Sequence, residues 1–380
     1  MPRQPELHVS PGIIGDLPEI LVQKHITHPA ILTGGRSVRG RDAWGALVDE
    51  LLRRGVDFSE FTLRGEPSPE YVDETIAQIR IDTPQCDGVV AIGGGSVIDA
   101  AKAVAAGLGM IAKGSHREDG FSILPYLEGV GDRVPDGTTL PLLAMPTTAG
   151  TGSEATMNAV LSTVGEKGFK KSLRHRDFVP TVALIDPELQ LDTPREVTRA
   201  SGLDCITQLL ESFVSPRANT IISALARDGL ERAGRAFPSL VAGQDNVELR
   251  EEMATAAYLS GVSLAAAGLG IVHGLAAPIG ARFDIPHGVV CGLLLAPSLV
   301  HAISHESVQS RYTAAAQAMG FSTSIELIDA IRRWAEPLGT LGAYGVTEGA
   351  LPVLVGATGR KEHPVPITDE EIAELVRVVL

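Results

Sequence analysis

The sequence predicts two domains, an α/β domain with a mainly parallel sheet followed by an all-α domain. Three observations support this fold class. The chain has 380 residues, and a domain usually holds roughly 100–200 residues. Its first half alternates short apolar runs with helical patterns, which is typical of a parallel sheet covered by helices. From Pro194 onward, Ala, Leu, Glu and Arg recur at helical spacing and strand-like runs are few.

The first half is predicted to supply the sheet and the helices that cover it. We expect strands at residues 30–33, 56–63, 88–92, 140–145 and 179–185. We expect the helices of this half at residues 37–54, 69–81 and 97–108.

The second half is predicted to be helical throughout. We expect its helices at residues 194–214, 220–241, 247–267, 287–304, 307–319, 325–336 and 369–379. Pro194 suits the first turn of a helix, with Thr193 as its cap. Thr368 and Glu371 form a capping box for the last helix. We therefore expect domains at 1–190 and 191–380, with a cleft between them.

The composition excludes several classes of protein. The chain is 44% hydrophobic and 21% charged, so a large core forms and disorder is not its main state. Its 32 basic and 46 acidic residues give a net charge of −14, which argues against nucleic acid or an anionic membrane as a partner. Cys86, Cys205 and Cys291 form no CxxC pair and suggest a reducing compartment. With no signal peptide and no apolar stretch of membrane-spanning length, we expect a cytoplasmic protein.

A glycine-rich turn predicts a phosphate site. The run GVVAIGGGSVIDAAK at 88–102 takes a strand through Gly93, Gly94, Gly95 and Ser96 into a helix. Glycines allow close backbone approach, and the N–H groups that open a helix attract an anion. A tight turn without a ligand is the alternative. The GxGxxG fingerprint is absent, and Asp99, three residues into the helix, also suits the helix dipole.

A second small polar loop follows the strand expected at 140–145. It reads PTTAGTGSE at 146–154 and includes Thr147 and Thr148. In a parallel sheet both loops lie at the carboxyl edge, where ligands bind. Hydroxyls and glycines there suit contacts to phosphate or ribose, although most loops of this composition bind nothing.

The helical half contains a candidate metal set. Asp204, Gln208 and Glu211 share one helix face because they stand at i, i+4 and i+7. His273 and His287 follow, and Pro286 places His287 in the first turn of a helix. A carboxylate and two imidazoles suit a divalent metal. Two hydrogen-bonded histidines and a solvated aspartate would also explain the pattern.

Taken in order, five motifs resemble those of the iron-containing (group III) alcohol dehydrogenases, in the superfamily of glycerol dehydrogenase and dehydroquinate synthase. They are GGGSVIDAAK at 93–102, PTTAGTGSE at 146–154, KKSLRHRDFVPTVALIDPEL at 170–189, SGLDCITQLLESFVS at 201–215 and HGLAAPIGARFDIPHG at 273–288. The resemblance implies a dehydroquinate synthase-like fold. It places a Rossmann-like nucleotide-binding domain before a helical domain, with the active site in the cleft.

The resemblance also implies a metal site, from which this chain departs. The family binds Fe²⁺ or Zn²⁺ through one Asp and three His, and Asp204, His273 and His287 occupy three of these positions. The fourth position holds Gln208, whose amide oxygen is a weaker ligand than imidazole. Ala277 replaces a His that assists proton transfer in the family, so the sequence names no catalytic proton donor.

The cofactor expected from the resemblance is NADP, with NAD as the alternative. NAD-using members often carry an Asp after the first strand, where this chain has Gly34, Arg36, Ser37 and Arg39. Arginines there would bind a 2′-phosphate, unless they simply face water. Lys170 lies where the family has a lysine near the cofactor, although Lys171 makes the register uncertain.

The expected function is an NAD(P)-dependent oxidoreductase that interconverts a small alcohol and its aldehyde or ketone, assisted by Fe²⁺ or Zn²⁺. One alternative is a metal-independent reductase of an oxo acid, similar to the maleylacetate reductases. Its substrate carboxylates would bind Lys170, Lys171, Arg174 and His175. Another alternative is a nucleotide-binding relative without catalysis. The family often forms dimers or larger assemblies, so we expect a homo-oligomer.

Overall fold

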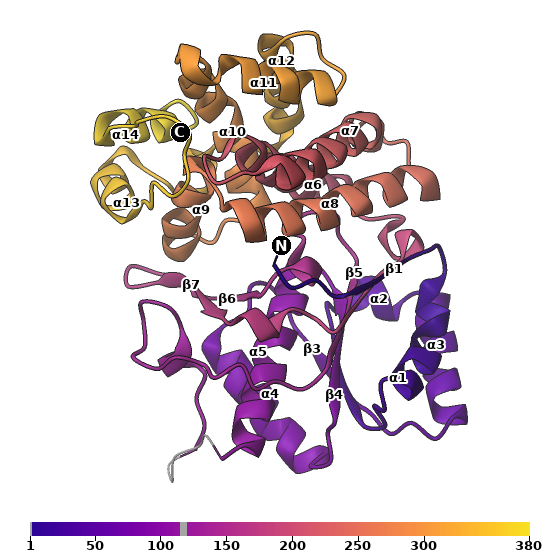
Figure 1. The fold of residues 1–380 in the computed structure, drawn as a ribbon. Helices are drawn as coiled ribbons and strands as arrows, with labels where there is room; N and C mark the ends of the chain where they lie inside the picture. The colour runs from indigo at the N-terminus through magenta and orange to yellow at the C-terminus, as the bar shows by residue number, and fades with distance from the viewer. Residues whose placement is uncertain (1, 115–119) are drawn as a thin grey trace.

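The computed structural model describes residues 2–114 and 120–380, except for the side chains of Arg36 and Ser37. Figure 1 shows an α/β half below and a helical half above, as the sequence predicts. The last strand of the sheet ends at Ile185, and the first long helix of the helical half begins at Arg195.

Six parallel strands form the sheet of the α/β half, in the order β1-β8-β5-β4-β2-β3. They are β1 (Glu6–Val9), β2 (Pro29–Thr33), β3 (Ser59–Thr62), β4 (Gly88–Gly93), β5 (Leu142–Pro146) and β8 (Val182–Ile185). Every residue of β4 and β5 is buried, because helices cover both faces of the sheet. Gly93 pairs with Pro146, so the two loops singled out in the sequence leave the sheet side by side.

Helices cover the two faces of this sheet. They are α1 (Leu17–Gln23), α2 (Arg36–Arg39), α3 (Asp42–Arg53), α4 (Pro69–Asp82) and α5 (Gly95–Ala112). One apolar cluster joins α4 and α5 to one face, and a second joins α1 and α3 to the other. α5 is long and apolar enough to cross a membrane, as are two helix pairs bent by 100° and 76°. The α5 span is 78% buried within the protein, so its apolar composition is that of a core helix.

The helical half is built around α6 (Arg195–Val214), which packs against α7 (Thr220–Ala242), α8 (Val247–Ala267) and α10 (His287–Ile303). The remaining helices are α9 (Ile271–Arg282), α11 (Glu306–Ala318), α12 (Ser324–Ala335), α13 (Leu351–Ala357) and α14 (Asp369–Arg377). One hydrophobic core runs through the helical half.

Two predictions of local structure are wrong. The helix expected at 37–54 is broken into α2 and α3, because Arg41 is extended and begins α3 as its N-cap. Pro194 is itself the N-cap of α6 and not a first-turn residue. Thr193 does not cap this helix, since its hydroxyl donates to the carbonyl of Gln190 at 2.7 Å. The capping box of Thr368 and Glu371 is confirmed.

Several elements escaped the sequence prediction. They are β1, α1, α9, α13 and an antiparallel hairpin of β6 (Asn158–Thr163) and β7 (Phe169–Arg174). β7 reads FKKSLR and is too charged for an apolar-run search. α9 contains Gly274 and Pro278, which are poor helix formers. Both β7 and α9 bear on the site, because they pack against each other where the two halves meet.

Close glycine contacts and a small apolar cluster join the halves. Gly152 has φ +59°, and an added Cβ would lie 2.6 Å from the backbone of Gly261 on α8. Only glycine tolerates both this conformation and this approach. Ala155 and Ile185 of the α/β half pack with Ala254 and Val262 of α8. The loop that carries residues 146–154 is therefore held directly against the helical half.

Candidate active site between the two halves

A cleft opens between the α/β half and the helical half. It brings together predicted cofactor residues and predicted metal residues. From the first set it is lined by Gly95, Ser96, Asp99 and Lys170, and from the second by Gln208, His273 and His287. Its other lining residues include Asn158, Ser172, Leu264, Leu269, Ala277 and Lys361. Segments that are distant in sequence thus share one cavity.

The glycine turn leads from β4 into α5. Gly94 is the N-cap of α5, and no side chain caps the helix. The first backbone N–H groups of an 18-residue helix are therefore available to an anion. The glycines are also needed for packing: a Cβ on Gly94 would lie 3.2 Å from Thr148 Oγ1, and one on Gly95 would overlap Thr151.

Asp99 takes part in a buried ion pair beside this turn. Its carboxylate accepts hydrogen bonds from the Ser153 hydroxyl and, at 3.1 Å, from the Val160 N–H. Lys102 Nζ lies 3.3 Å from the same carboxylate and donates to Ser153 Oγ at 2.7 Å. Burial raises the pKa of Asp99 and lowers that of Lys102. These contacts fix the hairpin of β6 and β7 to α5. A direct role of Asp99 in cofactor binding stays a prediction.

The segment after β2 differs from the sequence interpretation in one respect. No acid follows β2 locally, but Glu60 of β3 pairs with the Arg39 guanidinium at 3.0 Å. Arg39 also donates to Thr33 Oγ1 at 3.1 Å and stacks on Trp44. The charge of Arg39 is thus partly neutralised by an acid from the neighbouring strand.

Gly34 lies at the carboxyl edge of the sheet, where an added Cβ would be 3.6 Å from Val97 of α5. It therefore adjoins the glycine turn. Arg36 and Ser37, also predicted to bind cofactor, have side chains outside the described residues.

The hairpin resolves which of two lysines faces the cleft. Lys170 lines the cleft and pairs with Glu66 at 3.1 Å, whereas the neighbouring Lys171 points away because side chains alternate along β7. Arg174 lies 3.9 Å from Glu128, and His175 caps a short turn through Asp177. Neither of these two lines the cleft.

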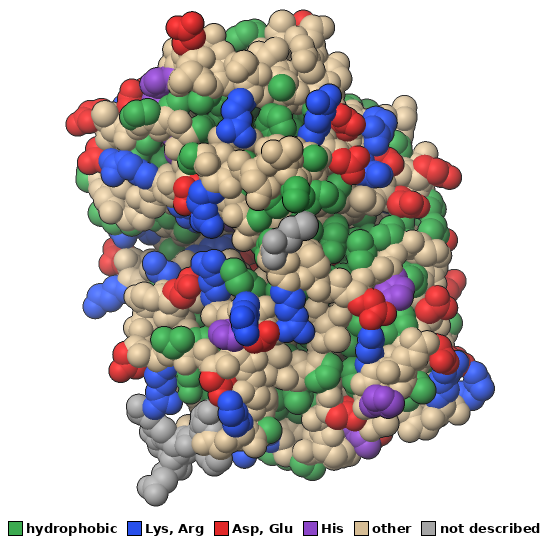
Figure 2. Space-filling view, in the orientation of Figure 1, with side chains coloured by type: hydrophobic (Ala, Val, Ile, Leu, Met, Phe, Trp, Pro, Cys, Tyr) green, Lys and Arg blue, Asp and Glu red, His purple; other side chains and the backbone are tan. Residues whose placement is uncertain are grey.

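A further lysine, Lys361, lines the cleft from the helical half. Within the described residues it has no ion-pair partner. Figure 2 shows Lys and Arg side chains gathered around the hollow between the two halves. The cleft itself is lined by two lysines, Lys170 and Lys361, and by two acids, Glu66 and Asp99.

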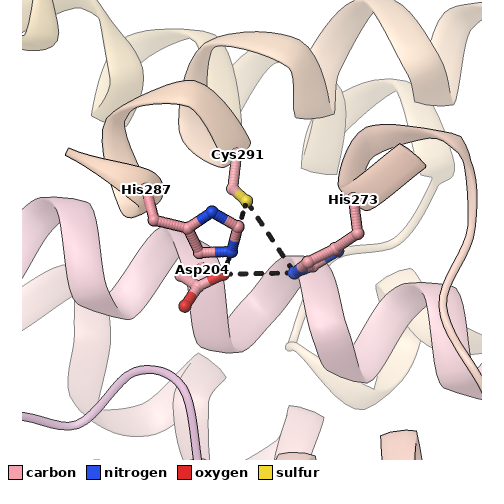
Figure 3. Close-up of side chains that lie close together, drawn as sticks. All are labelled: Asp204, His273, His287 and Cys291. Carbon is pink, nitrogen blue, oxygen red and sulfur yellow. Dashed lines mark hydrogen bonds and ion pairs between the residues drawn. The ribbon is translucent and has the colours of Figure 1, made fainter. Parts of the chain in front are cut away.

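Four side chains converge in the helical wall of the cleft, as Figure 3 shows. Asp204 comes from α6, His273 from α9, and His287 and Cys291 from consecutive turns of α10. Asp204 Oδ1 lies 3.3 Å from His273 Nε2 and 3.7 Å from His287 Nε2. Cys291 Sγ lies 3.8 Å from His273 Nε2 and 3.7 Å from His287 Nε2. All four donor atoms lie within 4.8 Å of one another, which suits one metal ion.

Gln208 lies beside this cluster, but its amide is already hydrogen-bonded. Its Nε2 donates to Asp204 Oδ2 at 3.3 Å, and its Oε1 accepts from the Ser260 hydroxyl at 2.7 Å. The oxygen expected to bind metal is thus directed at Ser260 of α8. A ligand role for Gln208 stays a prediction.

Glu211 is a site residue to which the sequence interpretation gave no role. Its Oε2 accepts from His273 Nδ1 at 2.7 Å, and its Oε1 accepts the Val272 N–H at 2.8 Å. A carboxylate on Nδ1 fixes the ring and leaves Nε2 free to bind metal. The sequence did place Glu211 on the same helix face as Asp204 and Gln208. Its role became clear only from the position of His273 in the structure.

Cys291 is the second missed residue. The sequence interpretation placed it with Cys86 and Cys205 as a small core residue, and it is indeed fully buried. Its position four residues after His287 was the signal, because i and i+4 share a helix face.

Burial and charge set the protonation of the cluster. Burial lowers the pKa of His287 to about 3 and raises that of the Cys291 thiol to about 12. Burial also opposes ionisation of Asp204 and Glu211, but nearby imidazoles hold the pKa of both carboxyls below the usual range. Burial favours neutral His273, but negative charge on its neighbours raises its pKa well above the usual value. The two imidazoles thus differ, because burial keeps His287 neutral whereas the neighbouring negative charges favour the charged form of His273.

A nucleotide-type glycine turn and a candidate metal cluster thus share one cleft between the two halves. The sequence profile described as "Iron-containing alcohol dehydrogenase" matches residues 5–187. A second profile, "Fe-containing alcohol dehydrogenase family, C-terminal", matches residues 198–380. The chain belongs to the iron-containing alcohol dehydrogenase family.

Individual relatives agree with this assignment. Long-chain-alcohol dehydrogenase 1 of Geobacillus thermodenitrificans is 30% identical, covering 97% of this chain and 93% of that protein. The 1-propanol dehydrogenase PduQ of Salmonella typhimurium is 34% identical over 70% of this chain, and the aligned part is only 64% of that protein's length. The crystal structure of sulfoacetaldehyde reductase from Bifidobacterium kashiwanohense in complex with NAD⁺ is 28% identical. It superposes with a TM-score of 0.85 and covers 100% of this chain and 98% of its own.

Proposed function

We propose that this chain is an NAD(P)-dependent alcohol dehydrogenase that interconverts a small alcohol and its aldehyde or ketone. One observation carries the proposal: Gly95 and Ser96 at the start of α5 line the same cleft as His273 and His287. The names of the two relatives, a propanol and a long-chain-alcohol dehydrogenase, support an alcohol as the substrate class. The NAD⁺ complex of the similar reductase supports a nicotinamide dinucleotide as the hydride carrier.

We assign a divalent metal, Fe²⁺ or Zn²⁺, to Asp204, His273 and His287. The residues present fit such an ion, because their donor atoms converge and Glu211 holds His273 by its other nitrogen. When bound, the metal polarises the substrate oxygen as a Lewis acid. The nicotinamide, when bound, exchanges the hydride.

The remaining work falls to the protein's own side chains. The α5 N-terminus binds the cofactor's pyrophosphate through backbone N–H groups. Leu264 and Leu269 line the cleft with apolar surface and restrict water around the reacting carbon. Ala277 also lines the cleft but has no proton to exchange, so water, a cofactor hydroxyl or another side chain must carry the proton.

The test combines cofactor binding, metal content and turnover. Wild-type protein should bind NADH or NADPH, contain a divalent metal and reduce short aldehydes. His273→Ala should lose the metal and turnover but keep cofactor affinity, because His273 lies in the opposite wall of the cleft. His8→Ala on the exposed β1 is the matched control and should keep all three. Full turnover by His273→Ala in the presence of a chelator would contradict the metal assignment.

The preference for NADP over NAD is a finer proposal. Gly34, Arg36 and Ser37 support it, whereas the pairing of Arg39 with Glu60 weakens it. Titration of NADH and NADPH side by side decides between them. Tighter binding of NADH would refute the NADP preference.

A second candidate function is a metal-independent reductase of an anionic oxo acid. Lys170 and Lys361 favour it, because both line the cleft and would pair with a substrate carboxylate. Chelator-treated protein should then reduce an oxo acid with NAD(P)H as fast as metal-loaded protein. Cofactor binding without turnover of any carbonyl would instead identify a relative that has lost catalysis.

The cytoplasmic location and the homo-oligomeric state expected from the sequence also remain proposals. Light scattering on the purified chain tests the second, and a monomer would refute it.

A further inference from the structure

The helical wall of the cleft contains one donor more than the family's metal positions supply. Cys291 is fully buried and projects its sulfur toward the Nε2 atoms of His273 and His287 (Figure 3). Within the described residues, the hydrogen-bond partners of its sulfur are members of this cluster. A structural cysteine does not require two imidazole nitrogens and a carboxylate facing its sulfur.

The distances match those of a four-coordinate ion. Zinc binds nitrogen and oxygen at about 2.0–2.1 Å and sulfur at about 2.3 Å, which at tetrahedral angles places N and O about 3.3 Å apart and N and S about 3.5 Å apart. The observed separations are 3.3 and 3.7 Å between Asp204 Oδ1 and the two imidazole nitrogens. They are 3.7 and 3.8 Å between Cys291 Sγ and the same nitrogens. The two remaining separations, between the imidazole nitrogens and between Asp204 and Cys291, lie within 4.8 Å, so a contraction around an ion would complete the tetrahedron.

The neighbouring side chain that occupies the family's fourth position has another task. Gln208 turns its NH₂ group toward Asp204 and its oxygen toward Ser260. In this arrangement Gln208 orients the carboxylate, and its oxygen is directed at Ser260 and not at His273. Another donor, the Cys291 thiol, lies on α10 one turn after His287 and converges with the other three.

We propose that Cys291 is the fourth metal ligand of this chain, in an Asp204–His273–His287–Cys291 site that favours Zn²⁺ over Fe²⁺. The inference rests on the proposed metal-assisted function, in which the substrate oxygen would then enter as a fifth ligand. As the metal–sulfur bond forms, the thiol S–H bond breaks and its proton leaves to solvent. A thiolate is a soft ligand and shifts a mixed oxygen and nitrogen site toward zinc. Gln208 acts as a positioning residue for Asp204.

Cobalt substitution tests the assignment without relying on activity. Co²⁺ added to metal-free protein should give visible bands of a tetrahedral ion together with an intense near-ultraviolet sulfur-to-cobalt charge-transfer band. Cys291→Ser should keep the visible bands and lose the near-ultraviolet band. Cys86→Ser, which alters a half-buried cysteine of the α/β half, is the matched control and should keep both.

Zinc affinity gives the second measurement. Cys291→Ser should bind Zn²⁺ at least about 10–100-fold more weakly, since loss of a ligand costs no less than loss of a partner that merely orients one. The ratio of its Zn²⁺ affinity to its Fe²⁺ affinity should also be smaller than that of the wild type. The wild-type cobalt spectrum decides the question even if Cys291→Ser does not fold.

Two results would overturn the proposal, and they differ in what else they affect. If wild-type protein binds Co²⁺ without the near-ultraviolet band and still turns over, Cys291 is not a ligand and the proposed function stands. If Co²⁺ does not bind at all while carbonyl reduction proceeds, both the ligand assignment and the metal-assisted function fail.

Discussion

Glu154, in the loop after β5, gives the sharpest test of the electrostatics at the interface of the two halves. Its side chain is buried, with Lys102 and Asp99 nearby. Burial raises the pKa of Glu154 from 4.5 to about 7, more than the charge of Lys102 lowers it. Between these two values the folded protein retains a proton that the unfolded chain has released. Stability is therefore complete below pH 4.5 and falls as the pH rises through about 7.

The size of this loss follows from the shift. One pKa unit corresponds to about 1.4 kcal/mol, so the shift of Glu154 amounts to about 3 kcal/mol of unfolding free energy above neutral pH. Glu154→Gln resembles the protonated carboxyl and never becomes charged. The variant should equal the wild type near pH 4 and exceed its free energy of unfolding by up to about 3 kcal/mol near pH 8.

Urea denaturation at both pH values, with chelator present to remove bound metal, measures the effect. Glu74→Gln on the exposed face of α4 is the control for removal of a surface carboxylate. The quantity that tests the prediction is the difference in free energy of unfolding between variant and wild type, compared at the two pH values. If that difference is the same at both pH values, Glu154 does not hold its proton in the folded state.

Three further predictions concern the two ligand sites. Gly94→Ala should weaken NAD(P)H binding at unchanged stability. Gly95→Ala should weaken NAD(P)H binding and also lower the melting temperature, because its Cβ overlaps Thr151. Equal cofactor binding by the wild type and both variants would contradict the pyrophosphate site. Glu60→Gln should release the Arg39 guanidinium from its ion pair. The affinity for NADPH relative to NADH should then rise by up to about tenfold, which is the size of one charge-assisted contact. An unchanged ratio of the two affinities would place Arg39 away from the cofactor. Glu211→Gln should weaken zinc binding about 10–100-fold, measured with a chelating dye; unchanged affinity would show that Glu211 does not orient His273.

Much of the fold could be predicted from local patterns, because its elements are strongly periodic. The buried strands β2 and β4 and the long helices α6, α7 and α8 lie within a few residues of the predicted ranges. The missed elements lack such patterns. β7 is stabilised by pairing with β6 across a hairpin, and α9 forms despite Pro278 because its buried face packs in the helical core. Tertiary contacts decide these segments, and no local pattern reports them.

The candidate site shows the same division between local and distant information. Asp204, His273 and His287 were readable from residue type and motif. The acid beside Arg39 was not, because Glu60 is 21 positions away in sequence and reaches it only through the parallel pairing of β2 and β3. The hydrogen bond from Ser260 to Gln208 could not be predicted either, since Ser260 lies on another helix.

Positions 208 and 291 are best understood together. The sequence alone indicates that a metal ligand is missing, because Gln208 of α6 stands where the resemblance implies a His. In the folded protein α6 packs directly against α10, so the side chains of both helices reach the same point beside His273. A donor absent from one helix can therefore be replaced from the other without moving the backbone. The replacement keeps four donors but changes their chemistry, because a thiolate takes the place of an imidazole. Such an exchange alters the choice of metal while the cleft, the cofactor turn and the orienting carboxylate of Glu211 stay in place.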